Sequence, residues 1–462
     1  MNDNKVKSGV RAEERLGTEK MLPLMMRMAL PAVLAQLVNL LYSIVDRIYI
    51  GHIENIGGDA LTGVGICAPV ILLISAFSSL VGGGGSPLMS ISLGKGDRDN
   101  AALILNNGFV MLVFVTVPLT LLPYPFMESI LRFSGASDLT LGYAEDYLSV
   151  YLIGTVFVLL GTGLNMFISC QGRPGIAMLS VVIGAVMNVL LDPIFIFGFD
   201  LGVTGAALAT VISQAASSAW VLTFLFSKKT SVRLDPRLMK PRLAVIGKIC
   251  ALGVAPFIMA STESVVGFAL NGQLRAYGSD AHVGALTVMQ SAMQAVSVPL
   301  MGFGQGIIPV ISYNFGHNRP DRVKECFKYA LMIMFSFNLL GMLFMILFPG
   351  AVAAVFTEDA AIRAIVKEYM PLFLLGMTIF GLQRTCQNTF VALGQAKISL
   401  FIALLRKIIL LVPLAFILPT FLGVSGIYAA EAVADGTAAI LCTLIFTLVF
   451  PKILAKKANP GK

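Results

Sequence analysis

The chain alternates between long stretches without charged residues and short loops that carry them. Asp, Glu, Lys and Arg are absent from nine stretches of 16 to 38 residues, at 60–94, 101–127, 147–172, 174–191, 201–227, 281–318, 329–357, 408–430 and 436–451. A bilayer core about 30 Å thick is crossed by roughly 20 apolar residues of α-helix. Because the stretches are continuously apolar rather than alternating, they indicate membrane helices and exclude a β-barrel.

Further spans contain isolated charges, and the whole pattern predicts twelve transmembrane helices. We expect them near residues 24–48, 60–85, 102–123, 145–169, 174–197, 203–226, 244–270, 284–310, 328–348, 366–390, 398–419 and 424–449. Hydrophobic residues make up 57% of the 462 positions and charged residues 13%, with a mean hydropathy of +0.85. Globular domains average roughly 25% charged residues. The composition therefore excludes an ordinary soluble protein and predicts an all-α polytopic membrane protein.

The loops on the two sides of the predicted membrane differ in charge. When loops are assigned to alternate sides, 25 of the 33 Lys and Arg residues fall on one side, including Lys5, Lys7 and Arg11 near the N-terminus and Lys462 at the C-terminus. Cytoplasmic loops carry such an excess, so we expect a multi-pass protein of the cell membrane with both termini in the cytoplasm. This topology and anionic lipid headgroups account for the net charge of +8, so we expect no nucleic-acid partner.

The two halves of the chain resemble each other at an offset of 222 residues. Glycine, proline, serine and aspartate positions repeat in the same order, with Gly82, Gly84, Pro87, Ser90, Gly94 and Asp99 matching Gly304, Gly306, Pro309, Ser312, Gly316 and Asp321. Tyr147, Gly154 and Gly172 likewise match Tyr369, Gly376 and Gly394, and Pro31 pairs with Pro256 at an offset of 225.

Six helices per half give the two repeats the same orientation, as in transporters whose lobes are related by an axis along the membrane normal. We therefore expect a cytoplasmic tail at 1–21, a first six-helix lobe at 22–227, a linker at 228–242, a second lobe at 243–450 and a cytoplasmic tail at 451–462. Such lobes suit alternating access around a site at their interface.

The chain shows no pattern of a catalytic or ATP-binding site. Gly82–Gly85 resembles a phosphate loop, but Gly94-Lys95 is followed by Gly96 instead of the Ser or Thr of a Walker motif. We expect these glycines to permit close helix packing or a bend. The six cysteines and three histidines lack metal or disulfide spacing, and the first 20 residues lack the apolar core of a removable signal peptide. We therefore expect no enzyme, no cofactor and no structural metal, and transport that draws on an ion gradient.

Several segments, in this order and spacing, resemble the MATE (multidrug and toxic compound extrusion) family. They are Pro31 with Tyr42-Ser-Ile-Val-Asp-Arg-Ile-Tyr-Ile-Gly51, Asn188-Val-Leu-Leu-Asp-Pro-Ile-Phe-Ile-Phe-Gly198, Gly202-Val-Thr-Gly-Ala-Ala-Leu-Ala-Thr210, and Gln305 with Ser312-Tyr-Asn-Phe-Gly316 and Asp321-Arg322. The resemblance runs from about residue 22 to 450 and looks closest to the MepA-like and DinF-like bacterial members. It implies a cation-coupled antiporter with two pseudo-symmetric six-helix lobes, which exports cationic or amphipathic drugs and works as a monomer in membrane lipid.

The resemblance places the family's coupling-cation site on Asp46, Asn188, Asp192 and Thr210, with H⁺ or Na⁺ as the ion. Independently, Asn188 and Asp192 lie four residues apart and so share one helix face, and a carboxylate in a span is costly enough to indicate a function. Low-dielectric surroundings favour the neutral carboxyl, which suits proton exchange, while the same oxygens are ligands for Na⁺.

Each of these four residues also has a plain structural interpretation. Asp46 can form an interfacial ion pair with Arg47, and Asp192 can cap the helix end before a proline. Asn188 can clasp a neighbouring helix, and Thr210 can bond to its own helix backbone.

The second lobe offers a weaker set of candidates. Glu263 lies near the middle of the seventh predicted helix, one residue from where the sodium-coupled branch of the family has a glutamate, and Gln290 and Gln294 are possible cavity residues on the eighth. The tenth helix has Arg384 and Gln387 but no aspartate where that branch has one. Possible hinges are Pro31 and Pro256, and the first helix is expected to bend near Pro31 during transport.

Four further charges lie inside spans, namely Arg406, Lys407, Glu431 and Asp435. We expect them to pair with one another or to reach the cytoplasmic surface. The alternative function is a flippase for lipid-linked precursors of the related superfamily, whose anionic cargo requires a basic cavity. That alternative predicts that Arg384, Arg406 and Lys407 line the central cavity with the acidic residues turned away.

Overall fold

The computed structural model describes residues 12–54 and 56–458, and these residues contain helices and no strand. Lys5, Lys7, Arg11 and Lys462, which contribute to the predicted charge asymmetry, lie outside the described residues. Residues 12–18 form a short helix before the first span. The first half then contains α2 (Met21–Gly51), α3 (Gly57–Ile66), α4 (Ala68–Gly94), α5 (Arg98–Leu121), η1 (Tyr124–Phe126), α6 (Met127–Phe133), α7 (Leu141–Ile153), α8 (Thr155–Cys170), α9 (Pro174–Pro193), η2 (Ile194–Gly198) and α10 (Gly202–Phe226).

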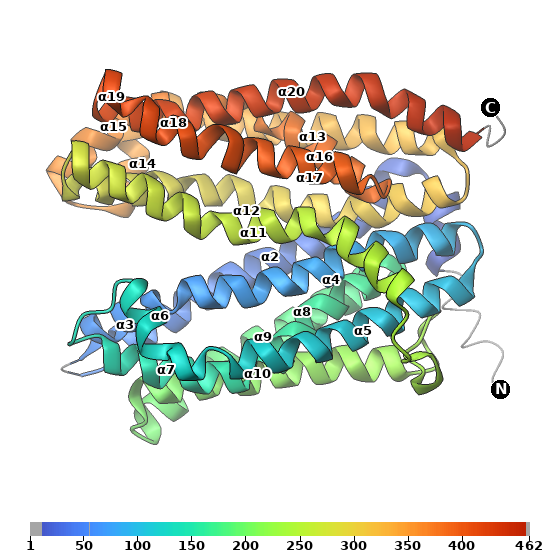
Figure 1. The fold of residues 1–462 in the computed structure, drawn as a ribbon, viewed down its shortest axis with the longest axis horizontal. Helices are drawn as coiled ribbons and strands as arrows, with labels where there is room; N and C mark the ends of the chain where they lie inside the picture. The colour runs from blue at the N-terminus through green and yellow to red at the C-terminus, as the bar shows by residue number, and fades with distance from the viewer. Residues whose placement is uncertain (1–11, 55, 459–462) are drawn as a thin grey trace.

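The second half repeats this order after a short 3₁₀ turn. It contains η3 (Pro236–Leu238), α11 (Leu243–Tyr277), α12 (Asp280–Gly316), α13 (Pro320–Leu347), α14 (Pro349–Phe356), α15 (Ala360–Leu374), η4 (Gly376–Ile379), α16 (Phe380–Ala392), α17 (Ala396–Leu404), η5 (Leu405–Leu411), α18 (Val412–Ile417), α19 (Pro419–Leu422) and α20 (Val424–Ala458). Figure 1 shows the helices of the first half grouped as one lobe and those of the second half as another, with the first and last described helices ending on the same side.

Ten helices of the described chain are long and apolar enough to span a bilayer, and two bent pairs raise the number to twelve. The bent pairs are α7 with α8, at 57°, and α15 with η4 and α16, at 44°. The first bend falls at Gly154 and the second at Leu375 and Gly376. Gly154 and Gly376 are a pair that the internal repeat matches. A methyl group at Gly154 would collide with Val211 of α10, and one at Gly376 with the Ala432 carbonyl oxygen of α20. The fold class is thus confirmed, with equivalent kinks in the two lobes.

The predicted helix ends differ from the structure in several places. α11, α12 and α20 each run well beyond their predicted ends, with 35, 37 and 35 residues. Hydropathy reports only the part of a helix inside the hydrocarbon, whereas helical hydrogen bonding continues past it. The predicted second span is divided at Cys67 into α3 and α4, and the short helices α6 and α14 were not predicted.

The two lobes meet through glycines that the internal repeat had singled out. A methyl group at Gly84 of α4 would collide with the Ile249 carbonyl oxygen of α11, and one at Gly306 of α12 would collide with Ala29 of α2. The close packing expected of these glycines is therefore present, and it joins the lobes. Hydrogen bonds cross the same interface from Ser90 Oγ to the Pro309 carbonyl oxygen (3.0 Å) and between the amides of Gln36 and Gln305 (3.1 Å).

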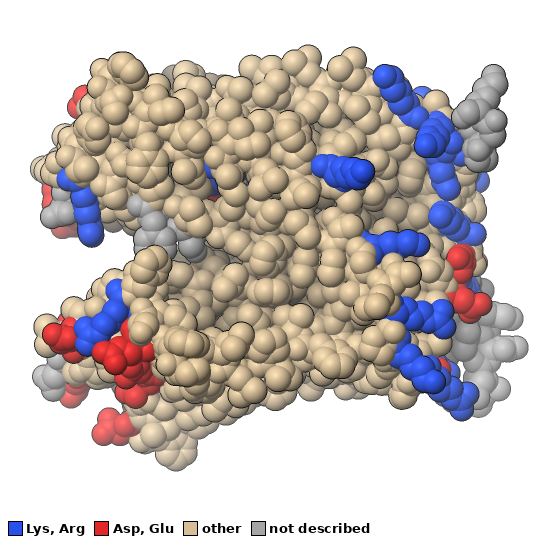
Figure 2. All heavy atoms as spheres, viewed as in Figure 1, with Lys and Arg blue, Asp and Glu red and all other residues tan. Residues whose placement is uncertain are grey.

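The contact between the lobes lies toward one end of the molecule. Figure 2 shows Lys and Arg gathered at the end where the described chain begins and finishes, and a hollow between the lobes at the opposite, more acidic end. The Tyr313 to Gly316 end of α12 packs against the Ile91 to Gly94 end of α4, at the basic end. The described conformation is therefore closed at the basic end and open at the other.

Candidate functional site

Three helices of the first lobe bring the four predicted coupling residues together. Asn188 Nδ2 of α9 donates to Asp192 Oδ1 one turn further on (3.1 Å) and lies 3.4 Å from Thr210 Oγ1 of α10. The four-residue spacing on one helix face explains the first contact. Asp46 of α2 approaches the same group, and its carboxyl faces that of Asp192 closely enough to share a hydrogen bond when one of the two is protonated.

The Asp46 carboxyl faces another carboxyl rather than its sequence neighbour Arg47. In the described chain, no ion pair within 4 Å joins Asp46 to Arg47. Asp192 and Asn188 are buried, and no donor reaches Asp192 Oδ2 or Asn188 Oδ1; Asp46 Oδ1 is likewise buried without a partner. Buried polar atoms are normally satisfied, so unpartnered ones call for an explanation. Three neighbouring residues thus each have a buried acceptor oxygen without a donor, which suits a site for a cation or a proton.

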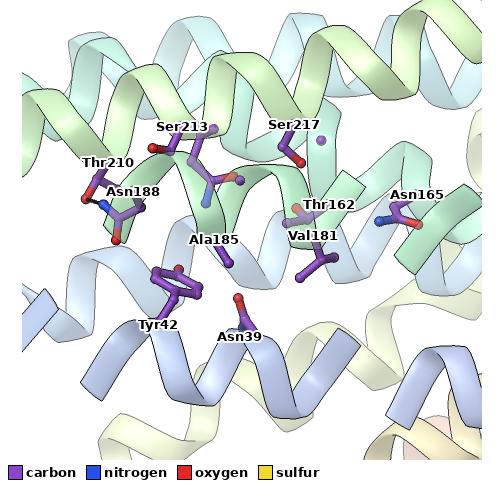
Figure 3. Close-up of a pocket in the computed structure, with 13 residues that line it drawn as sticks. Asn39, Tyr42, Thr162, Asn165, Val181, Ala185, Asn188, Thr210, Ser213 and Ser217 are labelled. Carbon is purple, nitrogen blue, oxygen red and sulfur yellow. Dashed lines mark hydrogen bonds between the residues drawn. The ribbon is translucent and has the colours of Figure 1, made fainter. Parts of the chain in front are cut away.

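A small cavity of about 50 Å³ adjoins these residues. Figure 3 shows its walls, with Asn39 and Tyr42 on one side and Asn188, Thr210 and Ser213 on the other. Small-molecule pockets measure about 300 to 1,000 Å³, while a water molecule requires about 10 to 15 Å³. The cavity therefore has room for an ion and a few water molecules and not for a drug.

Asn39 and Tyr42 are site residues that sequence reasoning missed. They and Asp46 occupy positions i, i+3 and i+7 of α2, so they share one helix face. A polar stripe on an otherwise apolar span was the available signal, because polar residues in membrane helices face the bundle interior. Asp192 lies just before Pro193, where α9 gives way to the wide π-helical turn η2. Such turns occur frequently at functional sites.

The second-lobe candidates do not all line one cavity. Glu263 lies 3.5 Å from the Lys407 ammonium, so its carboxylate already has a cationic partner. Gln290 and Gln294 do not line the second-lobe cavity that holds Glu263, and Gln294 is exposed. The cavity is instead lined by Gln383, Arg384 and Gln387 of α16 and by Arg406 and Lys407 of η5.

Arg406 is held by both acidic residues of α20. Its Nε contacts Asp435 Oδ1, and its Nη2 lies 3.9 Å from Glu431 Oε1. Three of the four in-span charges therefore pair with one another as expected, while Lys407 pairs with Glu263 instead. The cavity is lined by all three bases named by the flippase alternative and by one carboxylate, that of Glu263, while Glu431 and Asp435 contact Arg406 without lining the cavity. The flippase alternative therefore stays a prediction.

The two predicted hinge prolines lie inside uninterrupted helices. Pro31 lies in α2 and Pro256 in α11. A proline inside a helix removes one backbone hydrogen bond and favours a kink there. Pro256 packs against Gly83 of α4, which leaves no space for a methyl group at that glycine. A hinge function at either position stays a prediction.

The architecture and the buried polar group define a class of protein, a polytopic helical membrane transporter built from two repeats. The MatE family model matches residues 31–194 and 256–417, one stretch in each lobe. The chain belongs to the MatE family.

Similar proteins match along nearly the whole chain. The multidrug export protein MepA of Staphylococcus aureus (strain MRSA252) is 26% identical over 425 residues, which is 92% of this chain and 93% of that protein. An outward-facing multidrug resistance MATE transporter superimposes with a TM-score of 0.88 at 24% identity, covering 96% of this chain and 98% of the other. A MOP-superfamily transporter from Pyrococcus furiosus, with a binding pocket of reverse polarity that suggests a different function, superimposes with a TM-score of 0.88 at 24% identity. The superposition covers 95% of this chain and 98% of the other. At this identity the two structures show the shared fold, which does not decide what is transported.

Proposed function

We propose that this protein is a secondary active exporter of cationic or amphipathic compounds, driven by exchange for H⁺ or Na⁺. Membership of the MatE family and the MepA relatives, which are multidrug export proteins, support this class. The observation that carries the coupling mechanism is the convergence of Asp46, Asn188 and Asp192, each with a buried oxygen that lacks a donor.

A coupling ion satisfies this group in either of two ways. Two facing carboxylates cannot both stay charged in a dry site, so a proton shared between Asp46 and Asp192 removes the repulsion. Alternatively, Na⁺ is coordinated by the two carboxylates with the Asn188 and Thr210 oxygens, since hard cations prefer oxygen ligands. Either ion draws α2 toward α9 when it binds and releases the two helices when it leaves.

The conformation indicates how this local change drives transport. Cytoplasmic loops are rich in Lys and Arg, so the closed basic end faces the cytoplasm and the hollow in Figure 2 faces outward. Both termini are then cytoplasmic. Because α2 carries Asp46 and also packs against α12 of the other lobe at Gly306, movement of α2 alters the contact between the lobes. We propose alternating access in which ion binding from outside releases the drug and return of the loaded carrier exposes the ion to the cytoplasm.

The test is transport by the purified protein in liposomes. A fluorescent organic cation is followed under an imposed pH gradient or an imposed Na⁺ gradient, with the membrane potential clamped. We expect one gradient to drive the dye, and Asp192→Asn to lower the driven rate at least tenfold. Asp59→Asn, at an exposed carboxylate of α3, is the matched control and retains the rate. Driven transport that persists unchanged in Asp192→Asn contradicts the coupling mechanism, and no transport under either gradient contradicts the exporter itself.

A further inference from the structure

A short segment before the first span contacts both lobes at the closed basic end. Residues 12–18 form a helix, and residues 19 and 20 connect it to α2. We call residues 12–19 the N-terminal strap. Leu16 of the strap is fully buried, and Gly17 lies against the Tyr313 ring of α12. The coupling mechanism does not use this segment, so its ordered contacts call for a separate explanation.

The start of the strap rests on the first lobe. Its Ala12 carbonyl oxygen lies against Gly172, in the turn between α8 and α9, and would be only 2.5 Å from a methyl group added to that glycine. The buried Glu13 carboxylate lies 3.9 Å from Arg98 Nη2 at the start of α5. A side chain at position 172 would therefore push the strap away from the first lobe.

The end of the strap is held by the second lobe. Asn314 Nδ2 of α12 donates to the Leu16 carbonyl oxygen (2.9 Å). Arg322 Nη2 of α13 donates to the carbonyl oxygens of Leu16 (3.3 Å) and Glu19 (2.8 Å), and its Nε donates to Asn314 Oδ1 (2.9 Å). The last carbonyl groups of a helix lack partners within the helix. The second lobe thus supplies the donors that the end of this short helix requires.

The anchor departs from the internal symmetry of the chain. The offset of 222 residues places Ser92 and Asn100 of the first lobe where the second lobe has Asn314 and Arg322. In the part of the chain that the structure describes, Asn100 Nδ2 donates to Ser92 Oγ (2.8 Å), and neither side chain bonds to the strap. The residue types that hold the strap therefore occur in one repeat only, which indicates a function in docking it.

We propose that the N-terminal strap is a latch that stabilises the closed basic end and leaves Asn314 and Arg322 when that end opens. A segment fixed to both lobes keeps both sets of contacts only while the lobes are together. Bonds that exist in one conformation shift the equilibrium toward it by their free energy, and those donated by a charged guanidinium are the stronger kind. The latch goes beyond the proposed export, because it acts on the conformational equilibrium whichever compound or coupling ion is bound.

The experiment measures two distances by double electron–electron resonance in the purified full-length protein. Spin labels at Asp99→Cys of α5 and Lys324→Cys of α13 report the separation of the lobes, and labels at Glu14→Cys and Lys324→Cys report docking of the strap; all three positions are exposed. We expect Arg322→Gln to broaden the strap distance and to raise the ratio of separated to closed protein about tenfold. Leu16→Asp places a charge in the buried contact and should have the same effect without a change in either lobe.

Two exposed positions provide matched controls, and all variants carry Cys250→Ser to remove a partly accessible thiol. Arg319→Gln loses the same charge three residues before Arg322, and Thr18→Asp adds the same charge to the strap as Leu16→Asp. Both controls should leave both distances unchanged.

Two results overturn the inference. One is a strap that undocks in Arg322→Gln or Leu16→Asp while the lobes stay as close as in the controls. The other is a strap that stays docked in both variants. Because the distances are measured without a substrate or an ion gradient, they test the latch separately from the proposed export.

Discussion

The contact between α4 and α11, one from each lobe, predicts a substitution that shifts the protein between conformations. Gly253 of α11 is buried against α4, and a methyl group there would collide with the Leu80 carbonyl oxygen. The obstacle is backbone, which cannot rotate away as a side chain can. Extra methyl groups in a well-packed core cost about 1 to 3 kcal/mol. Since the clash exists only while the lobes are in contact, Gly253→Ala should favour the separated state about 5- to 150-fold.

Two further glycines serve as matched controls. Gly247 lies six residues earlier in the same helix with no atom within 4 Å of an added methyl group, so Gly247→Ala should leave the lobes in contact. Gly82→Ala places a methyl group 2.7 Å from the Gly163 carbonyl oxygen inside the first lobe. It should lower the melting temperature without separating the lobes.

The assay measures a distance across the basic end. Spin labels are attached at Asp99→Cys of α5 and Lys324→Cys of α13, both exposed positions. Double electron–electron resonance between them reports the separation of the lobes. The background carries Cys250→Ser, which removes a partly accessible thiol. We expect Gly253→Ala to increase the population at long distance. If the distance distribution of folded Gly253→Ala protein equals that of Gly247→Ala, the claim that this contact holds the two lobes together is refuted.

Three other changes test separate parts of the structure. Asp435→Asn leaves the buried Arg406 with only Glu431 as an acidic partner, so thermal unfolding should show a loss of stability of about 3 kcal/mol, and the double change with Arg406→Gln should recover part of it. Burial raises the pKa of Glu13 above its ordinary value of 4.5 despite the nearby Arg98. Because the buried position disfavours the charged carboxyl, packing of residues 12–18 against the rest of the protein is strongest at low pH and weakens as the carboxyl ionises. Hydrogen exchange of that segment should therefore speed up with pH beyond its intrinsic rate, and Glu13→Gln should remove this excess. Pro31→Ala restores a helical hydrogen bond in α2 and should slow dye transport with unchanged dye affinity; equal rates would exclude a hinge there.

The sequence by itself determined the spans, the repeat and part of the first-lobe site. Spans follow from hydropathy because a bilayer requires a minimum length of apolar helix. Asn188 and Asp192 are neighbours because a four-residue spacing on a helix places them so. The matched glycines of the two halves indicated close packing, and Gly84 and Gly306 make it at equivalent places.

Only the tertiary structure decided which residues of different helices meet. Asp46 faces Asp192 rather than pairing with Arg47, and Glu263 meets Lys407, 144 residues away, in a cavity that Gln290 and Gln294 do not line. In a soluble protein the apolar stripe of a helix fixes which face turns inward. A membrane helix is apolar on the faces that meet lipid and on those that meet other helices, so its sequence leaves the rotation about its axis open. Packing of the twelve spans sets that rotation, and with it the composition of both cavities.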